Sequence, residues 1–371
     1  MSGQHDLEIF LVAVPGLEQF LCAEAQECGF AGARAVPGGV ECRGPWAEVW
    51  RANLVLRGAT RVLARIGAFR AFHLAQLDKR ARKFPWAETL RPDVPVRVEV
   101  TCKRSKIYHQ GAAAQRIERA IAETLGAPLA EDAPVQVKVR IDDNLCTFSV
   151  DTSGESLHKR GHKEAVGKAP MRETMAALLL RASAYRGTEP VLDPMCGSGT
   201  FVIEAAEMAA GLLPGRDRSF AFEQLATFEA DTWKEMRAEK TAKAPALRFY
   251  GSDRDAGAVR MSQANAARAG VTEFTQFDTR PAGDLVRPDG PPGLVIVNPP
   301  YGARVGNRKP LFALHDSLGR VLQERFSGWR VGIVTSDTGL AKSTGLPFLP
   351  PGPPIAHGGL KVRLFRTDPL P

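Results

Sequence analysis

The stretch LVIVNPPYGARVG, residues 294–306, places four apolar residues directly before an asparagine, two prolines and a tyrosine. Four apolar residues in a row are typical of a short strand that is buried on both faces. Proline has no backbone N–H to donate to a neighbouring strand, so the strand must end before Pro299. The stretch therefore predicts a buried strand that runs into a stiff turn headed by a polar side chain, Asn298.

Patterns typical of strands alternate with patterns typical of helices on both sides of this stretch, from residue 171 onward. The predicted strands are PVLD, LRFYGSD, LVIV and RVGIVTS, and the predicted helices are MRETMAALLLRASAY, FVIEAAEMAAG, AGAVRMSQANAARAG and LFALHDSLGRVLQERF. This alternation predicts a parallel sheet covered by helices on both faces, with ligands at the carboxyl ends of the strands. The Pro/Gly-rich residues 345–360 are predicted to form a loop, followed by an edge strand, LKVRLFR.

The chain before residue 156 is interpreted as two α+β segments. Residues 1–60 contain two strand patterns, LEIFLVAV and VECRG, and two helix patterns, GLEQFLCAEAQECGF and PWAEVWRANLVL. Residues 61–155 contain the strand VPVRVEVTC, an amphipathic helix that ends near Gly126, and a hairpin that turns about residues 142–144. Residues 156–170 are rich in Gly, Lys and His and are predicted to be a linker.

Length and composition predict a soluble protein of two or three domains. The chain has 371 residues, 44% of them hydrophobic, and no apolar run is long enough to cross a bilayer. The amino terminus carries acidic residues where a signal peptide would carry basic ones, so we expect a cytoplasmic location and no membrane partner. The six cysteines form no C-x-x-C pair and no histidine cluster accompanies them, so we expect reduced thiols and no metal.

Positive charge is concentrated in one part of the chain. The formal net charge is +8, yet residues 51–110 hold 14 Lys/Arg against 4 Asp/Glu, a local balance of +10, so the remainder sums to −2. A basic segment beside a near-neutral domain is typical of a module that binds a polyanion. Charge alone leaves open the alternative of a solvated basic surface without a partner.

A glycine-containing turn, VLDPMCGSGTF at residues 191–201, follows the first predicted strand of the α/β part. Gly197 and Gly199 stand where the strand turns into a helix, and glycine there lets a ligand approach the backbone at a helix amino terminus. A phosphate-binding loop would carry a lysine after the glycines, whereas Thr200 follows them here. With Asp193 at the strand end, the turn suits a cationic or hydroxyl-rich ligand.

Two further aspartates are expected near the ends of neighbouring strands. Asp253, at the end of LRFYGSD, is placed to accept hydrogen bonds from both ribose hydroxyls of an adenosine. An aspartate at a strand end is most often a helix cap, but Asp255 is available for that role here. Asp278, in FTQFDTR after another predicted strand, is expected to take the adenine amino group, with a simple turn residue as the alternative.

The residues after the buried strand match the chemistry of an exocyclic amine. The two prolines fix the backbone, so the Asn298 side chain and the Pro299 carbonyl point in set directions, and both accept hydrogen bonds. Acceptors that draw both N–H groups of a planar amine toward them free its lone pair to attack a methyl group, without a strong general base. Tyr301 offers a ring on which a flipped base can stack. The alternative, a plain Pro-Pro loop, is disfavoured by the buried strand and by the glycine turn upstream.

Together, DPMCGSGTF and NPPYG resemble the class I S-adenosylmethionine-dependent methyltransferases, in the branch that modifies exocyclic amines of bases. Four further blocks, KFPWAETL, VTCKRSKIYHQGA, SVDTSGESLHKRGHK and APMRETMAALLL, are similar to the THUMP-containing RNA guanine-N2 methyltransferases of bacterial 23S ribosomal RNA and tRNA. The resemblance implies a ferredoxin-like α+β domain at 1–60, a THUMP RNA-binding domain at 61–155, a linker at 156–170, and a Rossmann-like α/β methyltransferase domain with a mostly parallel seven-stranded sheet at 171–371.

The resemblance also implies the site residues. Those expected to bind the cofactor, S-adenosylmethionine, are Asp193, Pro194, Cys196, Gly197, Gly199, Thr200, Asp253, Arg254, Asp278, Asn298, Arg172, Glu173 and Thr174. Those expected to hold the guanine are Asn298, Pro299, Pro300 and Tyr301. Those expected to contact RNA, as cations beside an aromatic ring, are Lys103, Arg104, Lys106, Tyr108, Lys159, Arg160 and Arg304, with His162 and Lys163 continuing the same track. One departure from the family is His357-Gly358-Gly359, where an Asn-Gly turn is expected.

The predicted function is therefore transfer of a methyl group to N2 of a guanosine in structured RNA, with a single methylation expected. A DNA adenine-N6 or protein-glutamine methyltransferase is an alternative, because both use N-P-P-Y, and the basic segment argues against them. A non-catalytic RNA-binding or assembly factor is an alternative of another class, and the intact set of Asp193, Asp253 and Asn298 argues against it. The choice between ribosomal and transfer RNA, the nucleotide and the oligomeric state stay open.

Overall fold

The protein is described by a computed structural model that covers residues 6–164, 171–239, 242–301 and 309–371. The described chain forms two compact units. The first consists of residues 6–13, 22–157 and 215–239, and the second of residues 14–21, 158–214 and 242–371, within those described. Over the same residues, no helix is long and apolar enough to cross a membrane. No disulfide joins the cysteines, all six of which are among the described residues: Cys22, Cys28, Cys42, Cys102, Cys146 and Cys196.

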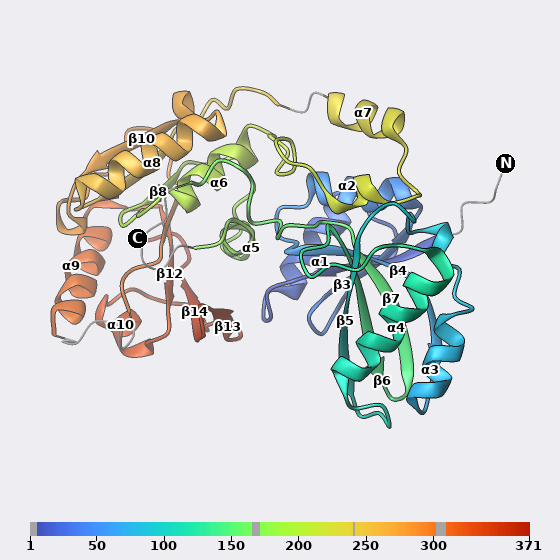
Figure 1. Cartoon of the computed structure of the whole chain (residues 1–371). Coiled ribbons are helices and arrows are strands. Elements are labelled where there is room, and N and C mark those ends of the chain that lie inside the picture. Colours follow the sequence, from blue (N-terminus) through green and yellow to red (C-terminus); the bar gives the residue numbers. More distant parts are fainter. Residues whose placement is uncertain (1–5, 165–170, 240–241, 302–308) are drawn as a thin grey trace. The chain divides into compact units, whose positions relative to one another are not determined.

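The first unit is built on a seven-stranded sheet in the order β2-β3-β1-β4-β7-β6-β5 (Figure 1). Its strands are β1 (Leu7–Val12), β2 (Arg34–Val36), β3 (Gly39–Gly44), β4 (Arg61–Arg70), β5 (Val96–Lys103), β6 (Val135–Asp142) and β7 (Leu145–Asp151). Neighbouring strands are antiparallel except β5 and β6. β4 pairs with β1 on one side and with β7 on the other, so the segments 1–60 and 61–155 share one sheet. The THUMP assignment itself stays a prediction.

The helices before residue 164 are α1 (Glu18–Glu27), α2 (Trp46–Val55), α3 (Leu74–Ala81), the one-turn η1 (Trp86–Glu88) and α4 (Gln110–Leu125). Strand β6 alternates buried residues such as Val137 and Val139 with half-exposed or exposed ones such as Lys138 and Arg140, which is the pattern of a sheet with one covered face. The hairpin predicted about residues 142–144 joins β6 and β7, and Gly126 ends α4 with φ of 84°. Both sequence predictions are confirmed.

The second unit is built on a seven-stranded sheet in the order β10-β9-β8-β11-β12-β14-β13 (Figure 1). Its strands are β8 (Val191–Asp193), β9 (Phe249–Asp253), β10 (Thr275–Thr279), β11 (Leu294–Val297), β12 (Arg330–Thr335), β13 (Ile355–His357) and β14 (Leu360–Arg366). The first five strands in this order are parallel, and β14 is antiparallel to both of its neighbours. The predicted Rossmann-like, mostly parallel sheet is confirmed.

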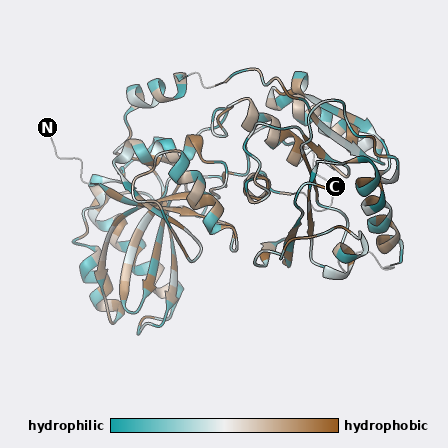
Figure 2. Ribbon diagram, turned by 180° about the vertical axis from the view of Figure 1, so that it is seen from behind, coloured by the Kyte–Doolittle hydropathy of each residue, from teal (hydrophilic) through white to brown (hydrophobic). Residues whose placement is uncertain are grey.

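The helices after residue 171 are α5 (Glu173–Ala182), α6 (Thr200–Ala209), η2 (Ala221–Gln224), α7 (Ala230–Ala238), α8 (Ala256–Ala269), η3 (Thr272–Phe274), η4 (Ala282–Asp284), α9 (Lys309–Arg325) and α10 (Thr338–Ser343). Hydrophobic colour is concentrated on the strands, while the helices carry much of the hydrophilic colour (Figure 2).

Strand β11 is buried from both sides, which explains its four consecutive apolar residues. Val295 and Val297 belong to a hydrophobic cluster with Leu318 and Leu322 of α9. Ile296 points to the opposite face of the sheet, close to the carboxyl end of α5. All four residues of β11 are buried, as the sequence predicts.

The prediction that LKVRLFR forms the edge strand of the sheet is wrong. β14 lies between β12 and β13, and β13, which falls inside the stretch predicted as loop, forms the edge. The two strands are joined by Gly358 and Gly359, whose φ angles of 55° and 82° suit a two-residue turn that matches the twist of the strands. A Gly-Gly pair thus forms the turn at the position where the resemblance predicts Asn-Gly.

Candidate functional site

Three adjacent strands of the second unit bring polar side chains to the carboxyl edge of its parallel sheet. Asp193, the last residue of β8, lies beside Gly251 of β9, and Leu192 lies beside Val295 of β11. Asp253 and Asn298 therefore extend two residues beyond the level of Asp193, one on each side of β8. Because strands lie about 4.8 Å apart, the backbones of these two residues stand on the order of 10 Å from each other. The edge thus presents a carboxylate, a second carboxylate and an amide in one row.

The turn after β8, residues 194–199, is called here the glycine loop. Gly197 and Gly199 have φ of 55° and 82°, the left-handed region that favours glycine. A Cβ on Gly199 would lie 3.1 Å from the Cβ and Oγ of Ser262, so this glycine permits close packing against α8. At Gly197 none of the described heavy atoms would lie within 4 Å of an added Cβ, so the loop faces open space there. The first glycine leaves room for a ligand, and the second anchors the loop.

Asp253 is held by the glycine loop and by the start of α8. Its Oδ2 accepts a hydrogen bond from the Gly197 N–H at 3.1 Å, and its Oδ1 accepts one from the Asp255 N–H at 3.0 Å. Asp255 caps α8 by accepting from the Gly257 N–H at 2.7 Å, as the sequence predicts. Each carboxylate oxygen of Asp253 keeps further acceptor capacity, and its orientation is fixed by backbone donors.

Asp193 is buried, and no ion pair joins it to a cation among the described residues. Its side chain accepts a hydrogen bond from the Met195 N–H at 3.0 Å, and the residue is 3% exposed. Burial, reinforced by the nearby Asp253 charge, raises the pKa of Asp193 to about 8 although the Met195 hydrogen bond opposes the change. Such a carboxyl group is stabilised in its charged form when a cationic ligand binds next to it.

Because the pKa of Asp193 is raised, the stability of the ligand-free protein is expected to depend on pH. The folded state keeps a proton on Asp193 that the unfolded chain releases above its ordinary pKa of 3.8, so stability falls as pH rises from about 4 to about 8. Asp193→Asn keeps the acceptor for Met195 but cannot ionise. The variant is expected to match the parent in Tm near pH 4 and to exceed it by about 4 °C or more near pH 8.5. Thermal unfolding at both pH values is the measurement, and a Tm difference that does not grow with pH contradicts it.

Asn298 carries an acceptor with no protein partner. Its side-chain Oδ1 is buried and has no hydrogen-bond partner among the described residues. Pro299 is buried, Pro300 is exposed and Tyr301 is half-buried. An unsatisfied buried acceptor costs on the order of 1–3 kcal/mol, so it marks a position that a donor from a ligand can fill.

The remaining predicted cofactor residues lie around the glycine loop or at its flanks. Pro194 and Cys196 are buried within the loop, and burial raises the pKa of the Cys196 thiol above its ordinary value, so this thiol stays protonated. Thr200 is the first residue of α6 and is buried. Arg254 is exposed directly after β9, and Asp278 lies within β10 rather than after it, where it accepts from the Gln276 side chain at 3.1 Å.

Residues 172–174 stand at the start of α5. Arg172 is exposed at the N-cap position, whereas Glu173 and Thr174 are buried in the first turn. The Thr174 Oγ1 is buried without a hydrogen-bond partner among the described residues. The structure thus gives Glu173 and Thr174 an interior position, and leaves Arg172 at the surface.

The predicted RNA-contact residues separate into three groups. Lys103, the last residue of β5, and Arg104, Lys106 and Tyr108, which follow it, lie in the first unit. Lys159 is exposed in the second unit, and Arg304 lies outside the described residues. Arg160 is 3% exposed and forms ion pairs with Glu204 and Glu207 of α6, so the prediction that it contacts RNA is wrong.

Burial extends to some other residues of the predicted linker, whereas Lys159, Gly161 and Glu164 are exposed. Leu157 and His162 are buried, and the Lys163 side chain is 11% exposed against Glu173. Arg160 and Lys163 thus neutralise buried carboxylates. Residues 165–170 lie outside the described residues.

Two residues that contact the glycine loop are not predicted from the sequence. Ser262 of α8 donates a hydrogen bond to the Gly197 carbonyl at 2.9 Å, and Asn265 donates to the Ser198 carbonyl at 3.0 Å. Both side chains fix the glycine loop from the side of α8, and both residues are fully buried. The sequence pattern that could have indicated them is their spacing: they stand three residues apart on the apolar face of the predicted helix. A polar side chain on such a face needs a hydrogen-bond partner.

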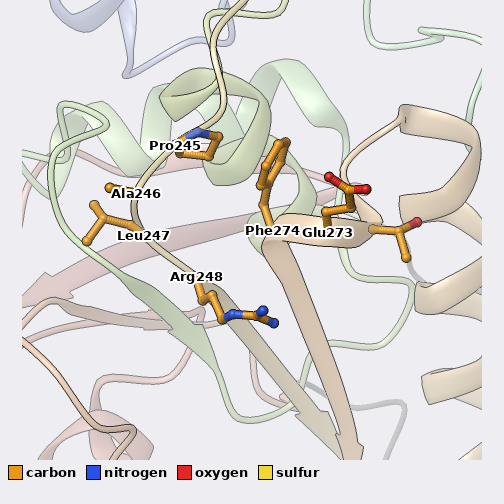
Figure 3. A pocket seen from close by; sticks show the side chains of 7 residues that line it. Pro245, Ala246, Leu247, Arg248, Glu273 and Phe274 are labelled. Atoms are coloured by element: carbon orange, nitrogen blue, oxygen red, sulfur yellow. The ribbon is translucent and has the colours of Figure 1, made fainter.

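A cavity of about 520 Å³ lies elsewhere in the second unit (Figure 3). Its lining residues are Pro245, Ala246, Leu247, Arg248, Thr272, Glu273 and Phe274. Arg248 directly precedes β9 and Phe274 directly precedes β10, so the cavity is at the amino edge of the sheet. The candidate site is at the opposite edge, where ligands of parallel sheets bind, and the cavity is no part of it.

Comparison with known proteins matches two parts of the chain to protein families. Residues 160–346 match the RMKL-like methyltransferase domain, and residues 8–63 match the RlmL ferredoxin-like domain. A possible methylase from Clostridium difficile 630 is 27% identical, with 99% of this chain and 98% of that chain covered at a TM-score of 0.89.

Two more solved structures are similar over nearly the whole chain. One, from Listeria monocytogenes, is described as a "predicted N6-adenine-specific DNA methylase"; it is 28% identical, with 98% and 96% of the two chains covered and a TM-score of 0.88. The other is SMU.472 complexed with SAH, 26% identical over 99% of both chains with a TM-score of 0.87.

The residues present fit S-adenosylmethionine, which presents a cationic amine, ribose hydroxyls and an adenine amine. Asp193 is a buried carboxyl group that pairs with no cation of the described residues, Asp253 has spare acceptor capacity, and open space lies beside Gly197. When bound, this cofactor supplies an activated methyl group. With its methyltransferase domain matched over residues 160–346, the chain belongs to the RMKL-like methyltransferases, enzymes that depend on S-adenosylmethionine, and carries an RlmL ferredoxin-like domain before that domain.

Proposed function

We propose that this methyltransferase acts on the exocyclic N2 amine of a guanosine in structured RNA, either 23S ribosomal RNA or tRNA. The observation that carries the proposal is the buried Asn298 Oδ1, which has no hydrogen-bond partner among the described residues and stands one strand away from Asp193. An amine with two N–H groups is the donor that such an acceptor suits. The guanine assignment is supported by the resemblance of the sequence blocks to guanine-N2 methyltransferases.

The roles of the chain's own residues follow from this placement. Asn298 and the Pro299 carbonyl would accept the two N–H groups of the target amine, and this would localise the nitrogen lone pair toward the methyl donor. Tyr301 would stack on the base and Pro299 and Pro300 would keep the turn from moving. Asp193 would hold the cationic end of the cofactor, Asp253 the ribose hydroxyls and Asp278 the adenine amine.

RNA contact is proposed for the end of the first unit where β5 runs into α4. Ser105 donates to the Lys103 carbonyl at 2.7 Å and accepts from the Asn144 N–H at 3.0 Å, while the Asn144 side chain accepts from the Lys106 N–H at 2.9 Å. These bonds tie the loop to the β6–β7 hairpin. Ile107 points inward, being 3% exposed, so Lys106 and Tyr108 on either side of it point outward.

This surface, made of Lys103, Lys106, Tyr108 and Phe72, is called here the aromatic tip. Tyr108 is 82% exposed, and the exposed Phe72 ring lies 5.6 Å from the Lys106 Nζ. Rings beside cations suit unpaired bases and their phosphates. Phe72 was not singled out from the sequence. Arg104 belongs to the tip less directly, because its guanidinium donates to Asp142 at 3.0 Å.

The open sheet face of the first unit is a weaker candidate for a polyanion. It borders a cavity of about 620 Å³ and carries several cations, but these are paired with carboxylates. Arg65 is 2.9 Å from Glu41, and Lys138 is 2.6 Å from Glu99. Since its charges largely cancel, this face offers little net attraction to phosphates, and the tip is preferred.

Replacing Tyr108 with alanine is expected to weaken binding of the substrate RNA by about 5- to 150-fold, because stacking on one aromatic ring contributes about 1–3 kcal/mol per base. The affinity for SAH should not change. Leu129→Ala is the matched control, since Leu129 is another exposed apolar residue, 44% exposed, at the opposite end of β5 beside Val96. Fluorescence anisotropy with labelled RNA measures both variants, and equal loss in the two would contradict the assignment of the tip.

The proposed function is tested by supplying labelled S-adenosylmethionine with RNA, DNA and protein from a strain that lacks this gene. Label is expected in RNA, and nucleoside mass spectrometry of separated ribosomal and transfer RNA should find N2-methylguanosine in one fraction. The same nucleoside should be missing from that fraction before the reaction. Incorporation into protein or DNA alone would overturn the proposal.

A second candidate function is adenine-N6 methylation, which the name of the Listeria monocytogenes structure favours. The adenine N6 amine also has two N–H groups, so Asn298 suits either base. The same nucleoside digest decides between them, because N6-methyladenosine and N2-methylguanosine separate by mass.

A further inference from the structure

Residues 160–163, called here the strap, lie on one polar face of α6. Thr200, Glu204 and Glu207 line this face at helical spacing, and all three are buried. Arg160 pairs with the two glutamates, and the Lys163 Nζ donates to the Thr200 Oγ1 at 2.9 Å. The strap therefore contacts α6 along its first two turns, beginning at the residue that follows the glycine loop.

Lys163 has a full set of acceptors. Besides Thr200, its Nζ donates to the Met171 carbonyl at 2.7 Å and lies 3.3 Å from the Glu173 Oε1. An ammonium group at the amino terminus of α6 is repelled by the helix dipole, and Glu173 at the start of α5 offsets this repulsion. The side chain thus joins the first residues of α5 and α6 at an electrostatic cost.

The strap reaches the glycine loop by a second route through α8. Arg268 donates from Nε to the His162 carbonyl at 2.7 Å and from its other end to the Asn265 Oδ1. Asn265 in turn donates to the Ser198 carbonyl at 3.0 Å. The contacts close a ring that runs from Ser198 through Asn265, Arg268 and the strap to Lys163 and Thr200.

We propose that Lys163 and Arg268 are positioning residues that hold the glycine loop in its cofactor-binding shape from behind. The loop contains two glycines in the left-handed conformation. A glycine backbone is conformationally free, so it loses much conformational entropy when a ligand orders it. A loop fixed beforehand loses less entropy on binding, so the ring raises cofactor affinity by fixing the loop. The proposal depends on the cofactor alone and is independent of the RNA target.

The test is titration of the full chain with SAH by calorimetry. Lys163→Met and Arg268→Met are each expected to weaken SAH binding by about 5- to 20-fold, because the loop then has to be ordered by the ligand. Arg260→Met is the matched control: Arg260 is an exposed arginine on the same helix, α8, and its replacement should leave the affinity unchanged. The Arg268 side chain is 31% exposed, so this variant serves even if the buried Lys163→Met chain fails to fold.

The double variant, Lys163→Met with Arg268→Met, distinguishes positioning of the glycine loop from a general effect on how the helices pack. Breaking one closed ring at two places should weaken SAH binding little more than breaking it at one, so the two effects should be clearly less than additive. Unchanged SAH affinity in both single variants, whatever happens to Tm, would overturn the proposal. So would strictly additive losses. Neither result bears on the guanine assignment, because no RNA takes part in the measurement.

Discussion

Replacing Asn298 with alanine is expected to lower the rate of methyl transfer by about 10²-fold or more, because a preorganised polar group aimed at the reacting amine is typically worth that much. The buried Oδ1 has no hydrogen-bond partner among the described residues, so its removal leaves no other protein group unpaired. Cofactor affinity should stay within about 3-fold of the parent value, since Asp193 and Asp253 are untouched. Single-turnover methylation of RNA and SAH calorimetry are the two measurements.

Two further substitutions at this position test the role of the acceptor. Asn298→Asp keeps an acceptor oxygen and is expected to retain more activity than the alanine variant. Asn298→Leu keeps the approximate size but has no acceptor, and it should be as inactive as alanine. Leucine and aspartate variants of equal activity would show that shape, and not hydrogen bonding, is what the reaction needs. Loss of SAH binding in all three would instead place Asn298 in the cofactor site.

Replacing Arg160 with methionine is expected to lower the free energy of unfolding by about 3–5 kcal/mol, the usual result of removing one partner of a buried ion pair. The side chains of Arg160, Glu204 and Glu207 are 1%, 1% and 0% exposed, so solvent cannot replace the lost cation. Arg104→Met is the control, because its ion pair with Asp142 involves a side chain that is 71% exposed and is worth about 1 kcal/mol or less.

Urea unfolding measures this effect, and hydrogen exchange of peptides from α6 localises it. Adding Glu204→Gln and Glu207→Gln to the Arg160 variant removes the stranded charges and should restore much of the stability. If Arg160→Met were as stable as the parent but bound RNA more weakly, the ion pairs would be unimportant and the original RNA-contact interpretation would return.

Local features of this fold follow from local sequence. The Asp255 cap of α8, the Gly126 end of α4 and the hairpin about residues 142–144 each depend on the conformational preferences of one or two residues. The edge strand is different, because whether β14 is an edge depends on a second strand that pairs with it. β13 has only three residues and lies among prolines, so its own sequence does not distinguish it from loop.

By itself the sequence determined the strands β8, β9, β11 and β12 of the second unit, the helices α5, α6, α8 and α9, and the polar residues at the carboxyl ends of β8, β9 and β11. That was possible because the apolar run 294–297, the glycine loop and Asn298 are each encoded within a few neighbouring positions. Only the tertiary structure decided what the cations at 160 and 163 do. A solvated lysine or arginine and a buried one have the same local sequence, and their difference lies in Glu204, Glu207 and Thr200, some forty residues further on. Burial of a charge depends on a distant partner, and no local pattern records that partner.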